Sequence, residues 1–198
     1  AGMLLENGRL YAAFTDGAVA AINPADGRLF WEVETALDIE RRPGNVPQFL
    51  DVDTTPVIVR GTMYVASFTA GLYALNPTNG TVEWRDETFQ GVTGIASAGR
   101  MLVISSARRG VSLLDLRTRE VQWEKAPERG APTAPIVTER GTVIYGETQG
   151  SLLALSLADG REIARAEGGA GFSATPSAHG TYGGAISNGG RFLCLRLN

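Results

Sequence analysis

The chain has 198 residues, of which 43% are apolar and 20% are charged, and this composition predicts one folded domain rather than a disordered segment. A formal net charge of −3 excludes the strongly basic balance of a nucleic-acid-binding protein. One cysteine and one histidine exclude a disulfide framework, a cysteine-based zinc site and a His-rich metal site. The longest apolar runs are far too short to span a membrane.

Turn glycines and short apolar runs recur with a period of about 40 residues. Each period holds four short strands separated by turns rich in Gly, Asn and Asp. This pattern predicts an all-β chain, a β-propeller of four-stranded antiparallel blades. In chain order the predicted parts are a blade at 2–34, an inserted loop at 35–49, complete blades at 50–87, 91–125 and 132–167, and a fifth blade at 172–198 that lacks its outer strand.

Four complete blades and an incomplete fifth predict a partial propeller that belongs to a larger ring. An open arc exposes apolar surface at both ends and an unpaired strand edge at the fifth blade. We therefore expect the chain to self-associate through these open ends.

The turns between the third and fourth strands carry a recurring motif. Residues 21–31 read Ala-Ile-Asn-Pro-Ala-Asp-Gly-Arg-Leu-Phe-Trp, and residues 74–84 repeat the pattern. The third blade keeps the tryptophan but has Arg119 in place of glycine, and the fourth keeps the glycine but has Ala164 in place of tryptophan. The motif resembles the tryptophan-docking repeat of pyrroloquinoline-quinone-type propellers, in which glycine turns the chain and tryptophan covers the joint to the next blade. The blade-docking residues expected from it are Trp31, Trp84, Trp123, Gly27, Gly80 and Gly160.

Two further segments indicate a narrower family within this class of propellers. Residues 50–59, Leu-Asp-Val-Asp-Thr-Thr-Pro-Val-Ile-Val, and residues 171–176, Gly-Phe-Ser-Ala-Thr-Pro, resemble the BamB family of outer-membrane assembly lipoproteins. The resemblance implies that the chain corresponds to the C-terminal half, or slightly more, of an eight-bladed ring. It also implies a non-enzymatic scaffold that supports insertion of β-barrel proteins into the outer membrane. The implied partners are a BamA-like barrel-assembly protein and nascent barrel strands, at the periplasmic side of a Gram-negative outer membrane, with a lipid anchor on the parent outside this chain.

Candidate partner-binding residues follow from the resemblance and from propeller geometry. Asp51 and Asp53 belong to the family-like segment, and two interpretations stay open: capping of backbone amides at the strand entry, or binding of the assembly protein. Loops that enter a blade and turns between its second and third strands emerge on the same face. This places Arg41, Arg42, Arg108 and Arg109 on the expected partner-binding face, whose mixed charge suits steered protein contacts.

The tryptophan repeat is also compatible with a function of another class. A quinone-dependent oxidoreductase, of which this chain is a fragment, is the alternative from another class, because such enzymes share the tryptophan repeat. It requires acidic and amide groups around a cofactor, and the inner strands offer none, so we expect no cofactor, metal or catalytic residue. His179 aligns with turn arginines and is expected to be exposed, whereas Cys194 aligns with Ala74 and Ala154 and is expected to be a small buried side chain.

Overall fold

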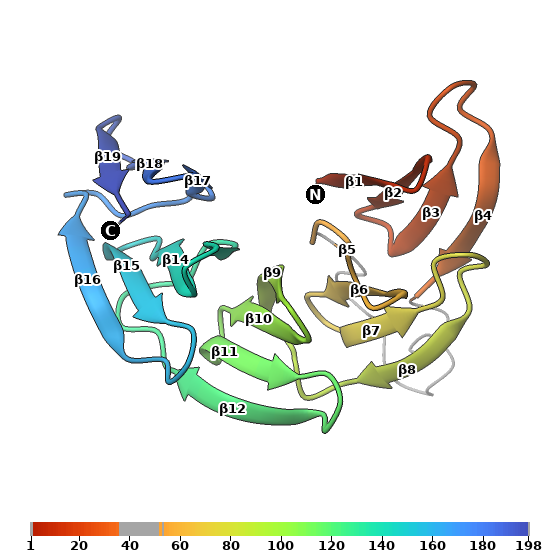
Figure 1. Cartoon of the computed structure of the whole chain (residues 1–198), viewed down its shortest axis with the longest axis horizontal. Coiled ribbons are helices and arrows are strands. Elements are labelled where there is room, and N and C mark those ends of the chain that lie inside the picture. The colour runs from red at the N-terminus through yellow and green to blue at the C-terminus, as the bar shows by residue number, and fades with distance from the viewer. Residues whose placement is uncertain (1, 36–51, 53, 198) are drawn as a thin grey trace. The chain divides into compact units, whose positions relative to one another are not determined.

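The computed structural model describes residues 2–35, 52 and 54–197. These residues form 19 β-strands and no α-helix, and among them there is no helix that could span a membrane. Consecutive strands pair into four sheets of four strands and one sheet of three (Figure 1). This confirms the predicted all-β architecture of four complete antiparallel blades and a fifth blade with three strands.

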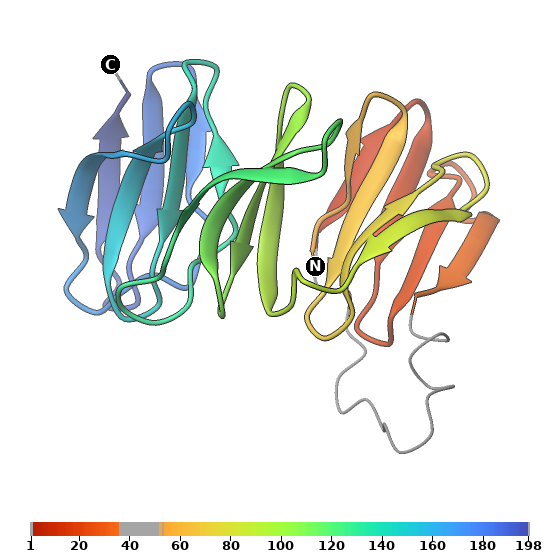
Figure 2. The ribbon, with the colours of Figure 1, turned by 90° about the horizontal axis from the view of Figure 1, so that it is seen from below.

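The chain divides into two compact units, residues 1–95 and 96–198, with the boundary inside the ninth strand. The first unit holds two complete sheets, in which the strands lie side by side in chain order and run antiparallel (Figure 2). The strands of the first sheet are β1 (Met3–Glu6), β2 (Arg9–Ala13), β3 (Ala18–Ile22) and β4 (Leu29–Glu34). Those of the second are β5 (Val57–Val59), β6 (Thr62–Ser67), β7 (Gly71–Leu75) and β8 (Val82–Asp86).

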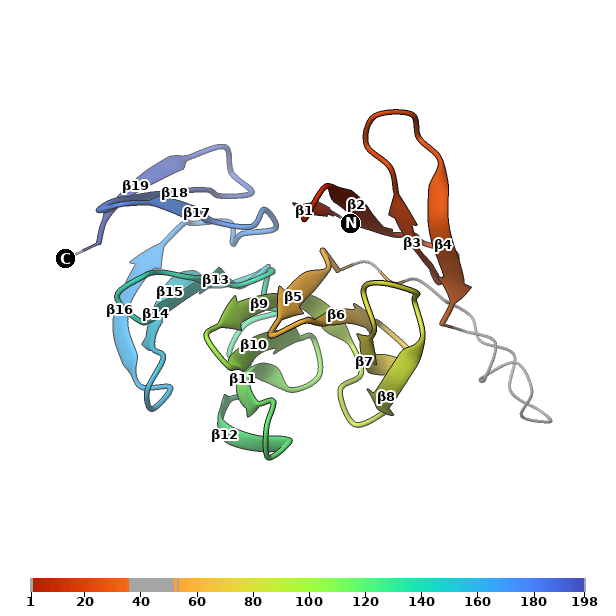
Figure 3. The same ribbon diagram turned by 45° about the vertical axis from the view of Figure 1, so that its right-hand side comes forward.

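The remaining strands form three sheets with the same order of pairing. The third sheet comprises β9 (Val92–Ala98), β10 (Met101–Ser106), β11 (Gly110–Asp115) and β12 (Glu120–Lys125). The fourth comprises β13 (Ile136–Val137), β14 (Thr142–Gly146), β15 (Ser151–Ser156) and β16 (Glu162–Glu167). The fifth comprises β17 (Ser177–His179), β18 (Tyr182–Ile186) and β19 (Phe192–Arg196), and Figure 3 shows it beside the fourth sheet.

Each complete sheet has an irregularity at the same place. The register between the third and fourth strands shifts directly after Ala21, Ala74, Leu113 and Ala154. In the first three sheets the residue opposite this position is a tryptophan, and in the fourth it is Ala164. A bulge increases the local twist of the strand pair, so the repeated bulge gives the residue at this position the same local setting in each complete sheet.

Burial follows the place of a strand in its sheet. The second and third strands carry near-continuous apolar runs, and in β7 and β11 every residue is buried, because both faces of such a strand are covered. The outer strands β4 and β12 are mostly exposed, although Trp31 and Trp123 are half-buried. Burial therefore concentrates on the faces where neighbouring sheets pack.

One prediction about side-chain burial is wrong. Cys194 is exposed, whereas Ala74 at the equivalent place in β7 is fully buried. Side chains alternate along a strand, and Leu193 and Leu195 of β19 pack toward the fourth sheet. Cys194 therefore points to the opposite face, which no described residue of this unit covers. His179 is exposed at the end of β17, as expected.

Candidate functional site

The first tryptophan of the repeat lies on the turn of the next sheet. Trp31 donates a hydrogen bond from Nε1 to the carbonyl oxygen of Pro77 at 3.0 Å, in the turn between β7 and β8. A Cβ atom added to Gly80 would lie 2.6 Å from the indole ring, so the ring packs on backbone that carries no side chain. Tyr11 packs beside the indole with ring centroids 6.2 Å apart. Trp31 thus joins the first sheet to the second.

The same contact recurs in the second unit. Trp123 of β12 donates from Nε1 to the carbonyl oxygen of Leu157 at 2.8 Å. An added Cβ on Gly160 would lie 2.6 Å from its indole ring. Trp123 also packs against the buried cluster that includes Val103, Leu113 and Tyr145. The joint between the third and fourth sheets therefore has the geometry of the joint between the first two.

Trp84 and Gly27, also expected to be blade-docking residues, have surroundings that differ from those of Trp31 and Gly80. Trp84 lies opposite Ala74 on β8, with its ring 5.9 Å from that of Tyr64. Gly27 and Gly80 share a φ of +75°, in the left-handed region that favours glycine. An added Cβ on Gly27 meets nothing within 4 Å. Gly27 therefore turns the chain, while no described indole packs on it.

Of the residues expected at the partner-binding face, Arg108 and Arg109 lie in the turn between β10 and β11. The hydroxyl oxygen of Ser106 accepts hydrogen bonds from both backbone amides, at 3.1 and 3.2 Å. The Arg109 guanidinium pairs with Glu124 of β12, with Nε 2.8 Å from the carboxylate. Arg108 is exposed. The turn therefore presents one exposed and one paired arginine on a fixed backbone.

The other predicted partner residues, Arg41, Arg42, Asp51 and Asp53, lie outside the described residues, as does nearly all of the predicted 35–49 loop. The neighbouring Val52 is fully buried, and its amide donates to the carbonyl oxygen of Phe14 at 3.1 Å. The structure thus neither brings the two aspartates together with the arginines nor separates them.

Sequence reasoning missed Glu147, a buried carboxylate in the turn between β14 and β15. Its two oxygens accept hydrogen bonds from the backbone amides of Glu128 and Arg129, at 2.8 and 3.2 Å. The third sheet has Ser106 at the equivalent position, where the hydroxyl caps its own turn. The second and third sheets hold Ser67 and Ser106 at this position, so a glutamate there was the available signal. Its longer side chain reaches the loop that enters the fourth sheet and fixes it.

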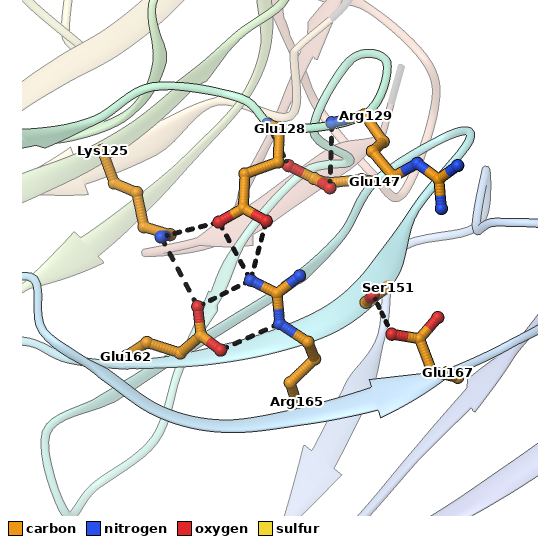
Figure 4. A network of polar contacts seen from close by, with 8 residues as sticks. All are labelled: Lys125, Glu128, Arg129, Glu147, Ser151, Glu162, Arg165 and Glu167. Atoms are coloured by element: carbon orange, nitrogen blue, oxygen red, sulfur yellow. Dashed lines mark hydrogen bonds and ion pairs between the residues drawn. The ribbon is translucent and has the colours of Figure 1, made fainter.

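Beside this loop, four charged side chains form a closed ring (Figure 4). Glu128 contacts Lys125 at 3.1 Å and Arg165 at 2.8 Å. Glu162 contacts Arg165 at 2.9 Å and Lys125 at 3.5 Å. The ring joins β12 of the third sheet to β16 of the fourth, on the joint that Trp123 also spans.

Contacts within the ring shift the pKa values of Glu128, Glu162 and Arg165. Hydrogen bonds from Arg165 hold the pKa of Glu128 and of Glu162 below its usual value of 4.5. The same bonds, with Glu162 contributing most, raise the pKa of Arg165. Glu128, Glu162 and Arg165 therefore stay charged at neutral pH.

Tyr145 lies under this region, and its hydroxyl has no hydrogen-bond partner among the described residues. Burial first, and the negative charge of Glu147 second, raise the pKa of Tyr145 above its ordinary value of 10. The phenol therefore stays neutral. Within the described ranges no group of three or more His, Cys, Asp or Glu side chains is placed to hold a metal ion. The geometry of this face is that of a fixed, mixed-charge protein surface.

Comparison with known proteins supplies the family. A sequence model described as "Outer membrane protein assembly factor BamB" matches residues 1–125. Proteins of the same name are similar to this chain in Kangiella koreensis, with 26% identity over 159 residues (80% of this chain and 40% of the relative), and in Pseudomonas aeruginosa, with 27% over 196 residues (98% and 50%). The chain spans half or less of the length of these relatives.

Solved structures show the fold. The crystal structure of BamB from Moraxella catarrhalis superposes with a TM-score of 0.70 at 22% identity, covering 96% of this chain and 55% of the other. The computationally designed Ika8 protein superposes with a TM-score of 0.78 at 11% identity, covering 98% and 57%. The likeness to the BamB structure, together with the repeated four-stranded sheets, confirms the predicted β-propeller class.

Proposed function

The chain belongs to the BamB family of outer membrane protein assembly factors, and on this premise we propose that it is a non-enzymatic protein-binding scaffold. It supports assembly and insertion of β-barrel proteins into the outer membrane, from the periplasmic side of a Gram-negative cell. The family match over residues 1–125 is the observation that carries the proposal. The proposal includes a lipid anchor on the protein and a BamA-like barrel-assembly protein as its partner.

The face that holds Arg108 and Arg109 supports this proposal. Its backbone amides donate hydrogen bonds to the side chains of Ser106 and Glu147, which fix the turns, so little backbone entropy is lost when a partner binds. Basic side chains of the β10–β11 turn lie near acidic ones of β12, a pattern that gives specificity and orientation in protein association.

The test is capture of this chain by a purified, immobilised BamA-like protein. Changing Arg108 and Arg109 to Glu should weaken capture by about fivefold or more at low salt and flatten its salt dependence, because the attraction that salt screens has been removed. Changing Arg28 and Arg161 to Glu is the matched control, because it alters the net charge equally, and both are exposed arginines in turns between third and fourth strands, at the other end of their blades. Equal loss in both variants would assign the effect to net charge, and no loss would remove Arg108 and Arg109 from the interface.

We propose that Asp51 and Asp53, with Arg41 and Arg42, extend the same partner-binding surface. Changing both aspartates to Arg should weaken capture while the chain still unfolds cooperatively. Undiminished capture with a lowered melting temperature would leave only the capping role of the two aspartates.

Self-association is a separate proposal. Three large apolar side chains of the fifth sheet are 54 to 68% exposed, namely Tyr182, Ile186 and Phe192, and exposed apolar surface favours contact with another copy. Light scattering across a range of protein concentrations should show a mass above 21.0 kDa that rises with concentration. A constant monomer mass would contradict this proposal and leave the scaffold proposal unaffected.

A further inference from the structure

A cavity of about 410 Å³ lies between the fourth and fifth sheets of the second unit. Its apolar lining comes from both sheets: Ile144, Ala154, Ile163 and Ala164 on the fourth, and Leu195 and Leu197 on the fifth. The turns at 138–140 and 180–181 complete its rim. An apolar cavity of about 150 Å³ is enough to bind benzene, so this one has room for a larger aromatic group.

The cavity occupies the place that an indole fills at the other joints. Ala164 lies opposite Ala154, as Trp31 lies opposite Ala21 and Trp123 opposite Leu113. At the two tryptophan positions the ring extends over the next sheet. At Ala164 the side chain ends at Cβ, and both Ala164 and the neighbouring Ile163 are exposed. The fourth sheet therefore has the docking position without the docking group.

The hydrogen-bond acceptor of the other joints is also present. Trp123 donates to the carbonyl oxygen of Leu157, whose own amide donates to Gly141 at 2.9 Å. In the fifth sheet the amide of Leu197 donates in the same way to Thr181 at 2.8 Å. Leu197 thus stands where Leu157 stands in the previous repeat, and it lines the cavity. Its carbonyl group is placed to accept a hydrogen bond from an indole N–H.

Volume alone does not distinguish this cavity. A cavity of the same volume lies at the joint between the first two sheets, but its lining comes from the β1–β2 hairpin and from Ile58, Gly61, Pro77 and Thr78. No residue of β3 or β4 lines that cavity, and at this joint the Trp31 indole of β4 lies on the turn at Pro77 and Gly80. Only the cavity beside Ala164, of these two, reaches down to the outer strands of its sheet. The missing indole accounts for that difference.

We propose that this cavity is a binding site for the tryptophan side chain of another polypeptide. The indole lies on Ala154 and Ala164, packs against Leu195, and donates its N–H to the Leu197 carbonyl oxygen, as the chain's own tryptophans do at two other joints. One part of this proposal rests on the proposed function. For a barrel-assembly factor, suitable polypeptides are unfolded barrel strands, because outer-membrane barrels carry girdles of aromatic residues at both membrane interfaces.

The experiment titrates the 198-residue chain with N-acetyl-tryptophanamide by calorimetry, with amide NMR spectra to locate the site. We expect saturable binding with a dissociation constant on the order of 1 mM and shifts confined to the residues around Ala164 and Leu197. Ala164→Trp, which supplies the indole from the chain itself, should weaken binding at least tenfold. Ala158→Trp, at an exposed turn position of the same sheet, is the matched control and should leave binding unchanged.

Two further measurements test the proposal: one with an indole that cannot donate a hydrogen bond, and one with a second cavity variant. The N-methyl-indole analogue should bind at least fivefold more weakly, because it cannot donate to the Leu197 carbonyl. If Ala164→Trp does not fold, Ile163→Glu serves in its place, since this exposed side chain lines the cavity without supporting the core. No saturable binding, or equal binding by the chain and the cavity variants, would overturn the proposal. Capture by the BamA-like protein is measured on the Ala164→Trp variant in parallel. If this variant is still captured while indole binding is lost, the cavity and the proposed function have been tested independently.

Discussion

Two joints of the second unit can be compared: the joint between the third and fourth sheets, and the joint between the fourth sheet and the three-stranded fifth sheet. They differ at the position of the docking tryptophan. Trp123 closes the first of these joints by packing on Gly160 and bonding to Leu157. Ala164 leaves the second open, with a cavity of about 410 Å³. The repeated strands therefore set where a joint lies, and the side chain at the tryptophan position contributes to whether that joint is packed or holds a cavity.

The largest expected effect comes from making the closed joint resemble the open one. Trp123→Ala should lower the free energy of unfolding by about 3 kcal/mol, because it removes a half-buried indole and leaves a cavity. The melting temperature should fall by on the order of 6–12 °C. His179→Ala and Val121→Ala, at exposed positions, should change it by less than about 2 °C. Equal effects would contradict the docking role of Trp123.

A smaller effect should distinguish a turn glycine under an indole from one without it. Gly80→Ala and Gly27→Ala both place alanine at a φ of +75°, which costs about 1 kcal/mol or more in each case. Only the Gly80 variant also pushes a Cβ into the ring of Trp31, at 2.6 Å. Gly80→Ala should therefore destabilise by about 1–2 kcal/mol more than Gly27→Ala in denaturant unfolding. A difference near zero would mean that the indole moves aside without cost.

The smallest effect concerns the charged ring on the closed joint. Glu128 and Glu162 have a folded-state pKa below 4.5, so they stabilise the fold above that pH and lose this contribution as the pH falls through their folded-state pKa. The double change of both residues to Gln removes this contribution at every pH, so it should lower the melting temperature slightly at pH 7 and bring the two proteins closer together as the pH falls below about 4.5. Parallel melting curves for the two proteins from pH 7 to 3 would show that the ring does not contribute.

Much of the fold could be predicted from the sequence because the same strand-and-turn pattern recurs in successive repeats. The recurrence of turn glycines and short apolar runs specifies four-stranded sheets, and the Asn-Pro-x-x-Gly turns specify where the tryptophans dock. The Asn23 and Asn76 side chains accept hydrogen bonds from backbone amides of these turns, at 3.0 and 2.9 Å. Such local chemistry recurs in the first two copies, so it is visible without a structure.

What could not be predicted depends on neighbours that differ between repeats. Cys194 aligns with a buried alanine, but the face of β19 on which it lies is not covered by any described residue. Glu147 replaces a serine that caps its own turn, and only the structure shows that the carboxylate reaches the amides of Glu128 and Arg129. The replacement of tryptophan by Ala164 was visible, but the cavity that results was not, because it also requires Leu195 and Leu197 of the next sheet.

The most direct test of the docking account measures Gly80→Ala and Gly27→Ala again in a Trp31→Ala background. If the excess cost at Gly80 comes from the indole, it disappears with the indole, and the two glycine variants become equal within about 0.5 kcal/mol. If Gly80→Ala remains more destabilising by the same margin without Trp31, the excess comes from the turn itself and the account of the blade joints is wrong.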